Sequence, residues 1–405
     1  MPIWKRNLFI CWFGMFVSGI GMSQIAPVLP LYIQHLGVHN TSSIAQLSGI
    51  AFGVTYIISA IFSPIWGHFA DKFGRKPMIL RASLGMALVI GCMGFAPNVY
   101  VLIGLRLLQG AITGFGTACT TLIATQTDKE HAGYALGTLS TGSIAGSLLG
   151  PIIGGFIEEN LGFQPVFFIT GALLMIAFVL TALFVKESFT PQAKKTVSIK
   201  EQWKSVPEKS LTIILLVTFF VLTFGLYSIE PIITVYVAQL TKDTSHVALV
   251  AGLAFSASGL ANIVAAPRLG KLSDKTGAHK VMLAALVVAG IIYIPQAFVR
   301  NPWQLMGLRF LLGLTLGGLN PSINTLVKKI TPDSLVGSVF GFTMSAGYWG
   351  VFGGAVLGGQ VAAYLGIRYV FFITSALLLI NAVWVYFTVY KKMNGLQNLK
   401  SIKEI

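Results

Sequence analysis

The amino-acid sequence predicts an all-α membrane protein with twelve transmembrane helices in two pseudo-symmetric six-helix bundles. Of its 405 residues, 55% are hydrophobic and only 10% are charged, whereas roughly a quarter of the residues of ordinary soluble proteins are charged. Apolar runs of about 18 residues or more recur along the chain, which is typical of membrane-spanning helices. A repeat inside the sequence, at an offset of about 203 positions, indicates two copies of one building block.

The apolar runs define twelve expected spans. They cover residues 7–36, 44–68, 78–96, 99–126, 133–157, 164–185, 211–240, 247–268, 280–298, 303–327, 335–363 and 368–390. The first six form an N-terminal bundle (residues 1–185) and the last six a C-terminal bundle (residues 211–390). A polar, lysine-rich cytoplasmic linker (residues 186–210) joins the bundles, and a short cytoplasmic tail (residues 391–405) follows.

The distribution of positive charge predicts the orientation of the spans, because cytoplasmic loops carry an excess of Lys and Arg. With the N-terminus in the cytoplasm, 23 of the 28 Lys and Arg residues lie on the cytoplasmic side, and only Lys242, Arg300 and Arg368 lie outside. Both termini are therefore expected in the cytoplasm, in a multi-pass protein of the plasma membrane. The net charge of +15 reports this topology, so no nucleic-acid partner is expected.

The internal repeat extends over much of the chain. Gly67, Asp71 and Gly74 each recur, with the same residue type, 203 positions later. The pattern Leu-x-Gly-Leu-Arg that ends at Arg106 recurs with the same offset and ends at Arg309. Two parallel halves imply a pseudo-twofold axis along the membrane normal and a central cavity, which suits alternating access. A membrane enzyme has no need of two equivalent halves, so no enzymatic activity is expected.

The first copy of the repeated motif is Gly67-x-x-x-Asp71-x-x-Gly74-Arg75-Lys76. It resembles the signature loop of the major facilitator superfamily, and the resemblance implies a cytoplasmic gate. Its members would be Gly67, Asp71, Gly74, Arg75, Lys76 and, in the second copy, Asp274. Gly67 is expected to let helices approach closely and Gly74 to permit a tight turn. Asp71 lies where a helix C-terminus disfavours an anion, so Arg75 is its expected partner. The alternative is a solvated charged turn.

Span four carries Arg106, followed by Gln109 and Gly110, in a pattern similar to the second motif of the same superfamily. The resemblance implies that Arg106 takes part in proton transfer. An arginine inside a span is costly and usually faces a cavity or a partner. The alternative is a side chain that snorkels to the outer interface.

Span five carries a glycine at every fourth position from Gly142 to Gly154. The run resembles the motif that marks the antiporter branch of the superfamily. The members of this antiporter motif would be Gly146, Gly150, Pro151, Gly154 and Gly155. Glycines on one helix face allow close packing, and a proline bends a helix locally. Small-residue packing alone is the alternative.

Glu230 is the one acidic residue of the chain that falls inside an expected span. It stands in span seven before Pro231, at the place where the repeat in span one has Ala26. Loss of water around a carboxyl group favours its protonated form, so Glu230 can exchange protons, and it can also attract a cationic substrate. We therefore expect Glu230, assisted by Arg106, to carry proton coupling. The alternative is a structural pairing with Arg106 or a backbone group.

Other polar side chains in the spans are candidates for lining a substrate cavity. They are Gln24, Gln34, Gln109, Tyr227, Tyr236, Asn262, Tyr293, Arg309, Asn320 and Asn324. The sequence has no Walker loop, no metal-ligand cluster and no Ser/His/Asp set, so neither a cofactor nor a metal ion is expected.

Taken together, these motifs resemble the twelve-span drug:proton antiporter branch of the superfamily, and among its members the multidrug and fluoroquinolone efflux pumps of Gram-positive bacteria (PmrA-like). The resemblance implies a monomer that exports amphipathic drugs, such as fluoroquinolones and cationic dyes, by alternating access in exchange for protons. A sugar or metabolite exporter or a lipid flippase on the same scaffold stays open as an alternative. A non-transporting membrane sensor is a further one, but it would be expected to carry an appended soluble domain.

Overall fold

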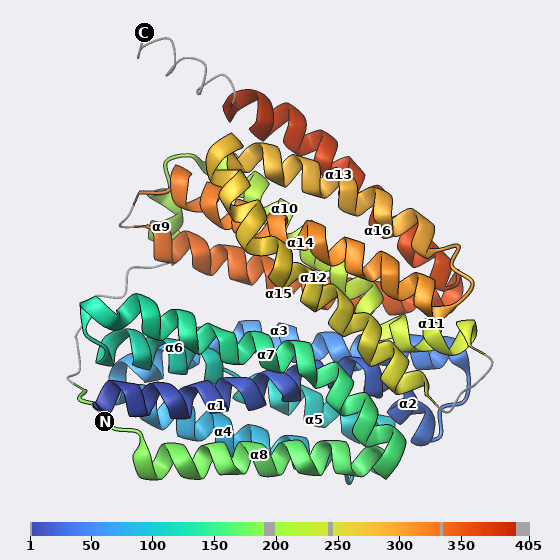
Figure 1. The fold of residues 1–405 in the computed structure, drawn as a ribbon, viewed down its shortest axis with the longest axis horizontal. Helices are drawn as coiled ribbons and strands as arrows, with labels where there is room; N and C mark the ends of the chain where they lie inside the picture. Colours follow the sequence, from blue (N-terminus) through green and yellow to red (C-terminus); the bar gives the residue numbers. More distant parts are fainter. Residues whose placement is uncertain (1, 190–198, 242–245, 333–334, 394–405) are drawn as a thin grey trace. The chain divides into compact units, whose positions relative to one another are not determined.

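The computed structural model describes residues 2–189, 199–241, 246–332 and 335–393. In this part of the chain every regular element is a helix (Figure 1). The chain divides into two compact units: the first comprises Met1–Lys194 and Pro231–Ser256, and the second Lys195–Glu230 and Ala257–Ile405. Residues 231–256, which the sequence assigns to the C-terminal bundle, thus pack with the first unit. The expected linker and tail lie partly outside the described residues.

The first unit holds the helices of the first six expected spans. They are α1 (Ile3–Ser23), α2 (Ile25–His35), α3 (Thr41–Phe73), α4 (Arg75–Met93), α5 (Val99–Ile112), α6 (Phe115–Gln126), α7 (Lys129–Leu161) and α8 (Phe163–Phe184). The unit also includes α11 (Ile233–Leu240) and the first part of α12 (Val247–Thr276).

The second unit holds the remaining helices. They are α9 (Ile199–Lys204), α10 (Lys209–Ile229), the rest of α12, α13 (Ala278–Gln296), α14 (Pro302–Ile330), α15 (Val336–Tyr364) and α16 (Ile367–Val385), which continues into a π-helical turn (Tyr386–Tyr390).

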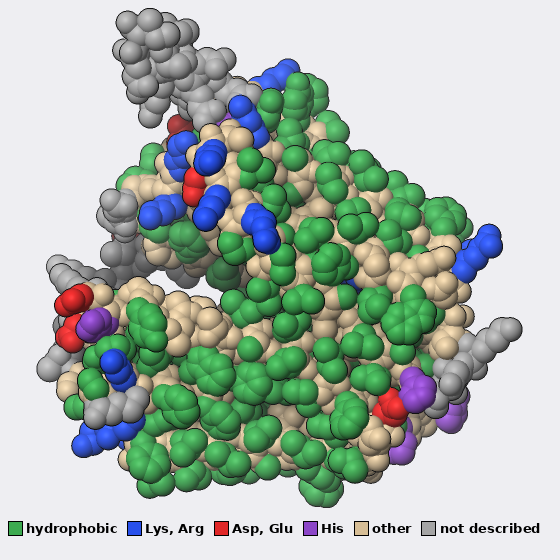
Figure 2. Space-filling model, in the orientation of Figure 1, with side chains coloured by type: hydrophobic (Ala, Val, Ile, Leu, Met, Phe, Trp, Pro, Cys, Tyr) green, Lys and Arg blue, Asp and Glu red, His purple; other side chains and the backbone are tan. Residues whose placement is uncertain are grey.

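Most of these helices have the length and apolarity of membrane spans. Ten helices of the described residues qualify, and α1 with α2 makes an eleventh if this pair, bent by 44°, is one span. The remaining expected span, the eleventh (residues 335–363), corresponds to α15 (Val336–Tyr364), a glycine-rich helix of 29 residues that is not among those ten. Hydrophobic side chains cover most of the face shown in Figure 2, and charged side chains gather toward the helix ends. This distribution fits helices whose middle parts lie in hydrocarbon.

Three expected spans are interrupted, and each interruption lies near a candidate residue. The first span breaks at Gln24, between α1 and α2, and the fourth breaks at Thr113 and Gly114, between α5 and α6. The seventh breaks at a short 3-10 segment that starts at Glu230. Pro151 lies inside α7, which continues through it to Leu161.

A seam of glycines holds α7 against α1, and Figure 1 shows the two helices side by side. A Cβ atom placed on Gly146 would collide with the backbone carbonyl of Phe16, and one on Gly150 would collide with the Ser23 hydroxyl. In the second unit, α15 packs on α10 in the same way, through Gly354 and its neighbours. The close packing expected of the antiporter motif is therefore present, in both halves of the repeat.

Candidate functional site

The lone acid of the spans meets a buried arginine within the second unit. Arg309 lies on α14 with 4% of its surface exposed, and Tyr293 lies on α13 with 1% exposed. Arg309 interacts electrostatically with Glu230 and with Tyr293. Opposite charges attract across a protein interior even when they are not in contact, so this interaction relates the end of α10 to α14, with Tyr293 of α13 beside Arg309. The sequence predicted Arg309 and Tyr293 only as cavity residues.

Local sequence explains why Glu230 stands where it does. Pro231 has no backbone N–H and cannot continue the hydrogen-bonding of α10, so that helix ends at Ile229. Glu230 is its C-cap, with its own N–H bonded to the carbonyl of Leu226. A helix C-terminus carries partial negative charge and disfavours an anion. An ionised Glu230 therefore depends on a nearby cation, and Arg309 supplies it.

Arg106 lies in the first unit and has neutral partners. Its Nε donates to the carbonyl of Ala51 at 3.1 Å, and its Nη1 donates to Oε1 of Gln109 at 2.8 Å. Only 2% of the residue is exposed, so the snorkelling alternative is wrong: two acceptors inside the bundle hold the guanidinium there. Its role in proton transfer stays a prediction.

The remaining cavity candidates differ in their surroundings. Gln24 is fully buried, and its Nε2 donates to Thr170 Oγ1 at 2.5 Å and to the carbonyl of Val166 at 3.4 Å. Its amide thus ties the break in the first span to α8 and is not free to line a cavity. Gln109, which bonds Arg106, is likewise buried. Of the others, Tyr236 is buried, Gln34 is exposed, and half-buried positions are taken by Tyr227, Asn262, Asn320 and Asn324.

The signature motif forms a sharper turn than the sequence suggested. α3 continues through the motif to Phe73, and α4 begins at Arg75. Gly74 alone makes the turn, with a φ of 96° that L side chains rarely adopt. Arg75 Nη2 contacts Asp71 Oδ1 at 2.6 Å, the ion pair expected from their spacing. Gly67 differs from expectation: among the described residues, no atom beyond its own stretch of α3 lies within 4 Å of a Cβ placed there, so they show no close helix approach at this position.

Glu187, which sequence reasoning missed, completes this turn. Its carboxylate accepts the backbone N–H of Arg75 at 2.9 Å and that of Lys76 at 2.8 Å. The ammonium group of Lys76 donates in turn to the carbonyl of Ala182, near the end of α8. A carboxylate at a helix N-terminus satisfies free N–H groups and complements the helix dipole. The available signal was an acid directly after span six, in an otherwise basic segment.

The residues beside Glu187 are bound as firmly to two other helices. Asn7 on α1 exchanges two hydrogen bonds with the backbone of Lys186, at 2.7 and 3.1 Å. Gln126 on α6 exchanges two with the backbone of Ser188, at 3.1 and 2.9 Å. The segment 186–188, expected to be linker, therefore connects the ends of α1, α4 and α6.

The second copy of the motif keeps the turn but loses the charges around it. Gly277 has a φ of 107° and separates α12 from α13. Asp274 is exposed, and Ala278 stands where the first copy has Arg75. His279, at the place of Lys76, is buried with its ring 5.6 Å from that of Tyr390. The second turn therefore lacks the arginine and the lysine that the first turn carries at these two places.

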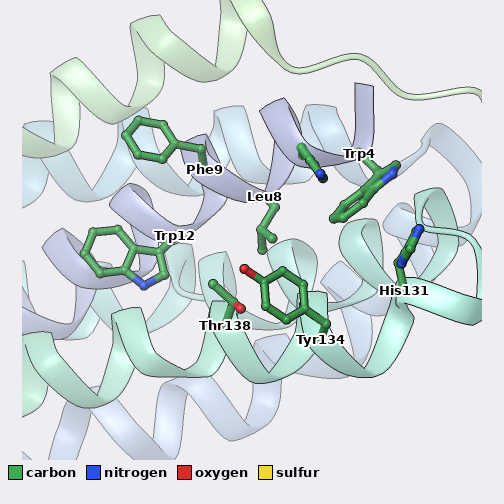
Figure 3. Close-up of a pocket in the computed structure, with 8 residues that line it drawn as sticks. Trp4, Leu8, Phe9, Trp12, His131, Tyr134 and Thr138 are labelled. Atoms are coloured by element: carbon green, nitrogen blue, oxygen red, sulfur yellow. The ribbon is translucent and has the colours of Figure 1, made fainter. Parts of the chain in front are cut away.

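An aromatic pocket of about 610 Å³ lies between α1 and α7, near the N-terminal ends of both helices (Figure 3). Its lining includes Trp4, Phe9 and Trp12 from α1, and His131 and Tyr134 from α7. The sequence reasoning named none of these residues. The sequence feature that could have indicated the pocket is the recurrence of aromatic side chains at helical spacing on α1 and α7, the two helices that the glycine seam brings together.

Comparison with known proteins places these features in context. The sequence matches the family model described as Major Facilitator Superfamily over residues 11–250 and 218–401. It is 42% identical, over 386 residues, to the multidrug resistance protein MdtG of Salmonella typhimurium, covering 95% of this chain and 96% of that protein. It is 43% identical, over 382 residues, to MdtG of Enterobacter lignolyticus, covering 94% and 91%. The structure of the nucleoside transporter NupG is similar with a TM-score of 0.76 at 13% identity, covering 95% of this chain and 99% of NupG. This likeness confirms the predicted fold.

Proposed function

This chain belongs to the major facilitator superfamily, whose members are transporters and not enzymes, and we propose that it exports amphipathic drugs in exchange for protons. The drug-efflux part rests on the relatives named multidrug resistance proteins, which align along nearly the whole chain. The substrates we propose are fluoroquinolones and cationic dyes, as the resemblance to PmrA-like pumps implies. The protein would act as a monomer in the plasma membrane, with both termini in the cytoplasm.

The observation that carries the proton-coupling part is the Glu230–Arg309 interaction. While Glu230 is ionised, it neutralises a cation that is almost wholly buried. Once Glu230 takes up a proton, Arg309 keeps its buried charge without a carboxylate to neutralise it, and the Tyr293 phenol is the neutral group that remains beside it. This change destabilises that arrangement. Proton binding therefore favours a different packing of α10 against α14. A cationic substrate that competes with Arg309 for the carboxylate would act on the same equilibrium.

The other motif residues have supporting roles in this proposal. Asp71, Arg75 and Lys76 form a cytoplasmic gate together with the turn at Gly74. The antiporter motif in α7 holds α1 and α7 together as one body. Arg106 assists proton transfer from its buried position on α5.

Transport by reconstituted protein tests the proposal. Proteoliposomes would be loaded with a fluorescent cationic dye, and dye efflux would be followed while a pH gradient is imposed. We expect wild-type efflux to follow the gradient and Glu230→Gln efflux to be independent of it. Glu208→Gln is the matched control, because Glu208 is an exposed acid paired with Lys392 at 2.9 Å. A Glu230→Gln variant that transports like wild type at every pH would show that the carboxylate has no such role.

The substrate range is tested separately by resistance profiles. Cells that overexpress the protein would be compared with cells that lack it, on fluoroquinolones, cationic dyes and sugars. We expect resistance to the first two groups and no effect on sugars. Protection restricted to sugars or metabolites would instead favour a metabolite exporter.

A further inference from the structure

The aromatic pocket exists because the glycine seam between α1 and α7 stops short of the helix ends. Gly142 is the last seam glycine, and a Cβ placed there would lie 2.7 Å from the backbone oxygen of Trp12. The next two positions along the same face of α7 are Thr138 and Tyr134, four residues apart. Because these side chains are larger, the two helices cannot stay in backbone contact. A gap opens at the end that carries Lys5.

The walls of the gap are aromatic and held in place. Trp4 stacks on the His131 ring at 5.0 Å between centroids, and Trp12 donates its indole N–H to Thr141 at 2.9 Å. At the rim, 69% of Phe9 and 68% of Tyr134 are exposed. Tyrosine and tryptophan are enriched where spanning helices meet the lipid headgroups.

The rim faces the same way as other apolar side chains of α7. Tyr134 lies on the flank of that helix that also carries Leu149 and Phe156, which are 40% and 58% exposed. Large apolar side chains exposed along one flank of a spanning helix are typical of a lipid-facing surface. The pocket therefore opens toward acyl chains.

One lysine lines the pocket itself, while the acids Asp128 and Glu130 lie just before His131 at the start of α7. This lysine, Lys5, has its ammonium group 5.3 Å from the centre of the Trp4 ring, and His131 lies beside that ring. Within the described chain, no carboxylate is among the lining residues. A positive group next to an apolar cavity complements an anionic amphiphile.

The second unit fills the corresponding place with its own side chains. In these spans the repeat offset is 204, so Thr138 corresponds to Phe342. The Phe342 ring packs edge-on against Trp203 of α9, at 5.4 Å between centroids. This half of the fold thus accommodates large apolar rings where the first half leaves a pocket.

We propose that the pocket between α1 and α7 binds an anionic phospholipid from the leaflet on the side of Lys5. The upper part of an acyl chain occupies the aromatic gap, and the phosphate and headgroup lie at Lys5 and His131. A volume of about 610 Å³ accepts such a segment. This site is separate from the proposed transport site and does not depend on the function proposed above.

Quenching of tryptophan fluorescence by brominated lipids tests the proposal. The purified full-length chain would be placed in phosphatidylcholine nanodiscs that contain brominated phosphatidylglycerol or brominated phosphatidylcholine at the same mole fraction. The protein has seven tryptophans, so the pocket signal is the part lost in the Trp4→Phe/Trp12→Phe variant. We expect this part to show an apparent affinity about fivefold higher for phosphatidylglycerol, the effect of one lysine near an anionic headgroup.

Matched variants distinguish the contribution of the Lys5 charge from that of the open volume of the pocket. Lys5→Gln should remove most of the preference, whereas Lys209→Gln, at the corresponding place in the second half, should keep it. Thr138→Phe gives the first half the residue of the second and should abolish pocket quenching by both lipids. Ser140→Phe, on an exposed face of the same helix, should leave it unchanged.

Several results would overturn the proposal. Equal affinity for the two lipids in wild type would do so, as would a preference that survives both Lys5→Gln and Thr138→Phe. Displacement of the lipid by inorganic phosphate alone would show that the pocket selects a free anion. A preference that appears only in a chain truncated after Met393 would show that the tail is the occupant.

Discussion

Arg106 and Arg309 occupy equivalent positions in the repeat, but the structure gives them different chemistry. Both are almost wholly buried, at 2% and 4% exposure. Arg106 donates to a backbone carbonyl and to the amide of Gln109. Arg309 interacts with the carboxyl group of Glu230. Protonation of a carboxyl group can change the electrostatics of the second arginine directly, whereas the partners of the first in the described chain, Ala51, Gln109 and Tyr56, include no carboxylate.

The motif turns at Gly74 and Gly277 differ in the opposite sense, because here the first half keeps the charges. The first turn carries the Asp71–Arg75 ion pair and the Glu187 cap. At the corresponding places the second half has Ala278 for Arg75 and, 204 positions after Glu187, Lys391. The two halves of the repeat therefore share the backbone geometry of the turn, but their charged residues differ. The charged turn is found in the first half, and the acid that interacts with a buried arginine is found in the second.

The largest expected effect comes from removing one arginine at a time. Arg309→Met leaves Glu230 without its cation. Breaking a fully buried pair costs about 3–5 kcal/mol, and because Glu230 is half-buried, we expect a cost at the lower end of that range. Arg106→Met removes hydrogen bonds from a charged donor to neutral acceptors, which costs about 1.5–3 kcal/mol. Thermal unfolding in detergent would measure both.

A double variant sharpens this test. Glu230→Gln/Arg309→Met removes both charges, so we expect it to recover much of the stability that Arg309→Met loses, without regaining proton-dependent transport. If Arg309→Met and Arg106→Met are equally unstable and the double variant recovers nothing, the two arginines do not differ as described.

A smaller effect is expected at the Glu187 cap. Glu187→Gln weakens charge-assisted hydrogen bonds to the N-terminus of α4 and should cost about 1 kcal/mol. Glu208 is the matched control, since it stands at the N-cap of α10 with no side-chain cap bond. We expect Glu208→Gln to leave the unfolding temperature within error of wild type. Equal shifts of the unfolding temperature in Glu187→Gln and Glu208→Gln would contradict a stabilising role of Glu187 at the N-terminus of α4.

The smallest effect on stability is expected at Asp71. Its ion pair with Arg75 joins residues four apart on a helix end, and Asp71 is 54% exposed, so Asp71→Asn should cost about 0.5 kcal/mol or less. Under the proposed gate role of Asp71, Asp71→Asn should nevertheless lower the efflux rate several-fold, more than Asp274→Asn does. Dye efflux measured beside thermal unfolding checks both parts. Unchanged efflux in Asp71→Asn would show that the Asp71–Arg75 ion pair is a solvated charged turn without a role in the gate.

The fold and the local contacts were predictable because they depend on spacing along the chain. The apolar runs predicted the helices, and a glycine in each copy of the motif predicted the turns at Gly74 and Gly277. The Asp71–Arg75 pair followed from an i, i+4 spacing. The expected span ended at residue 68 because apolarity defined it, whereas α3 runs on to Phe73 through the charged residues of the motif.

Contacts between distant segments were not predictable in the same way. Glu187 and Arg75 are 112 positions apart, and nothing in either segment indicates the other. The sequence suggested Arg106 as a partner of Glu230 and placed Arg309 among the cavity residues. The repeat shows that the two arginines occupy equivalent positions, but it does not show which of them lies near the acid. The aromatic pocket depends on where the α1–α7 seam ends, which only the packed helices reveal.

The order of the two buried arginines along the chain bears on how the protein is made. An arginine at the middle of a spanning helix opposes membrane insertion by about 3 kcal/mol. Arg106 bonds to Ala51 on α3, and Arg309 interacts with Glu230 and Tyr293, all of which precede it in the sequence. When the ribosome delivers either arginine-bearing span, helices able to receive its guanidinium have already been synthesised. Each buried arginine is thus synthesised after its described partners on other helices, whereas Gln109, on the same helix as Arg106, follows it.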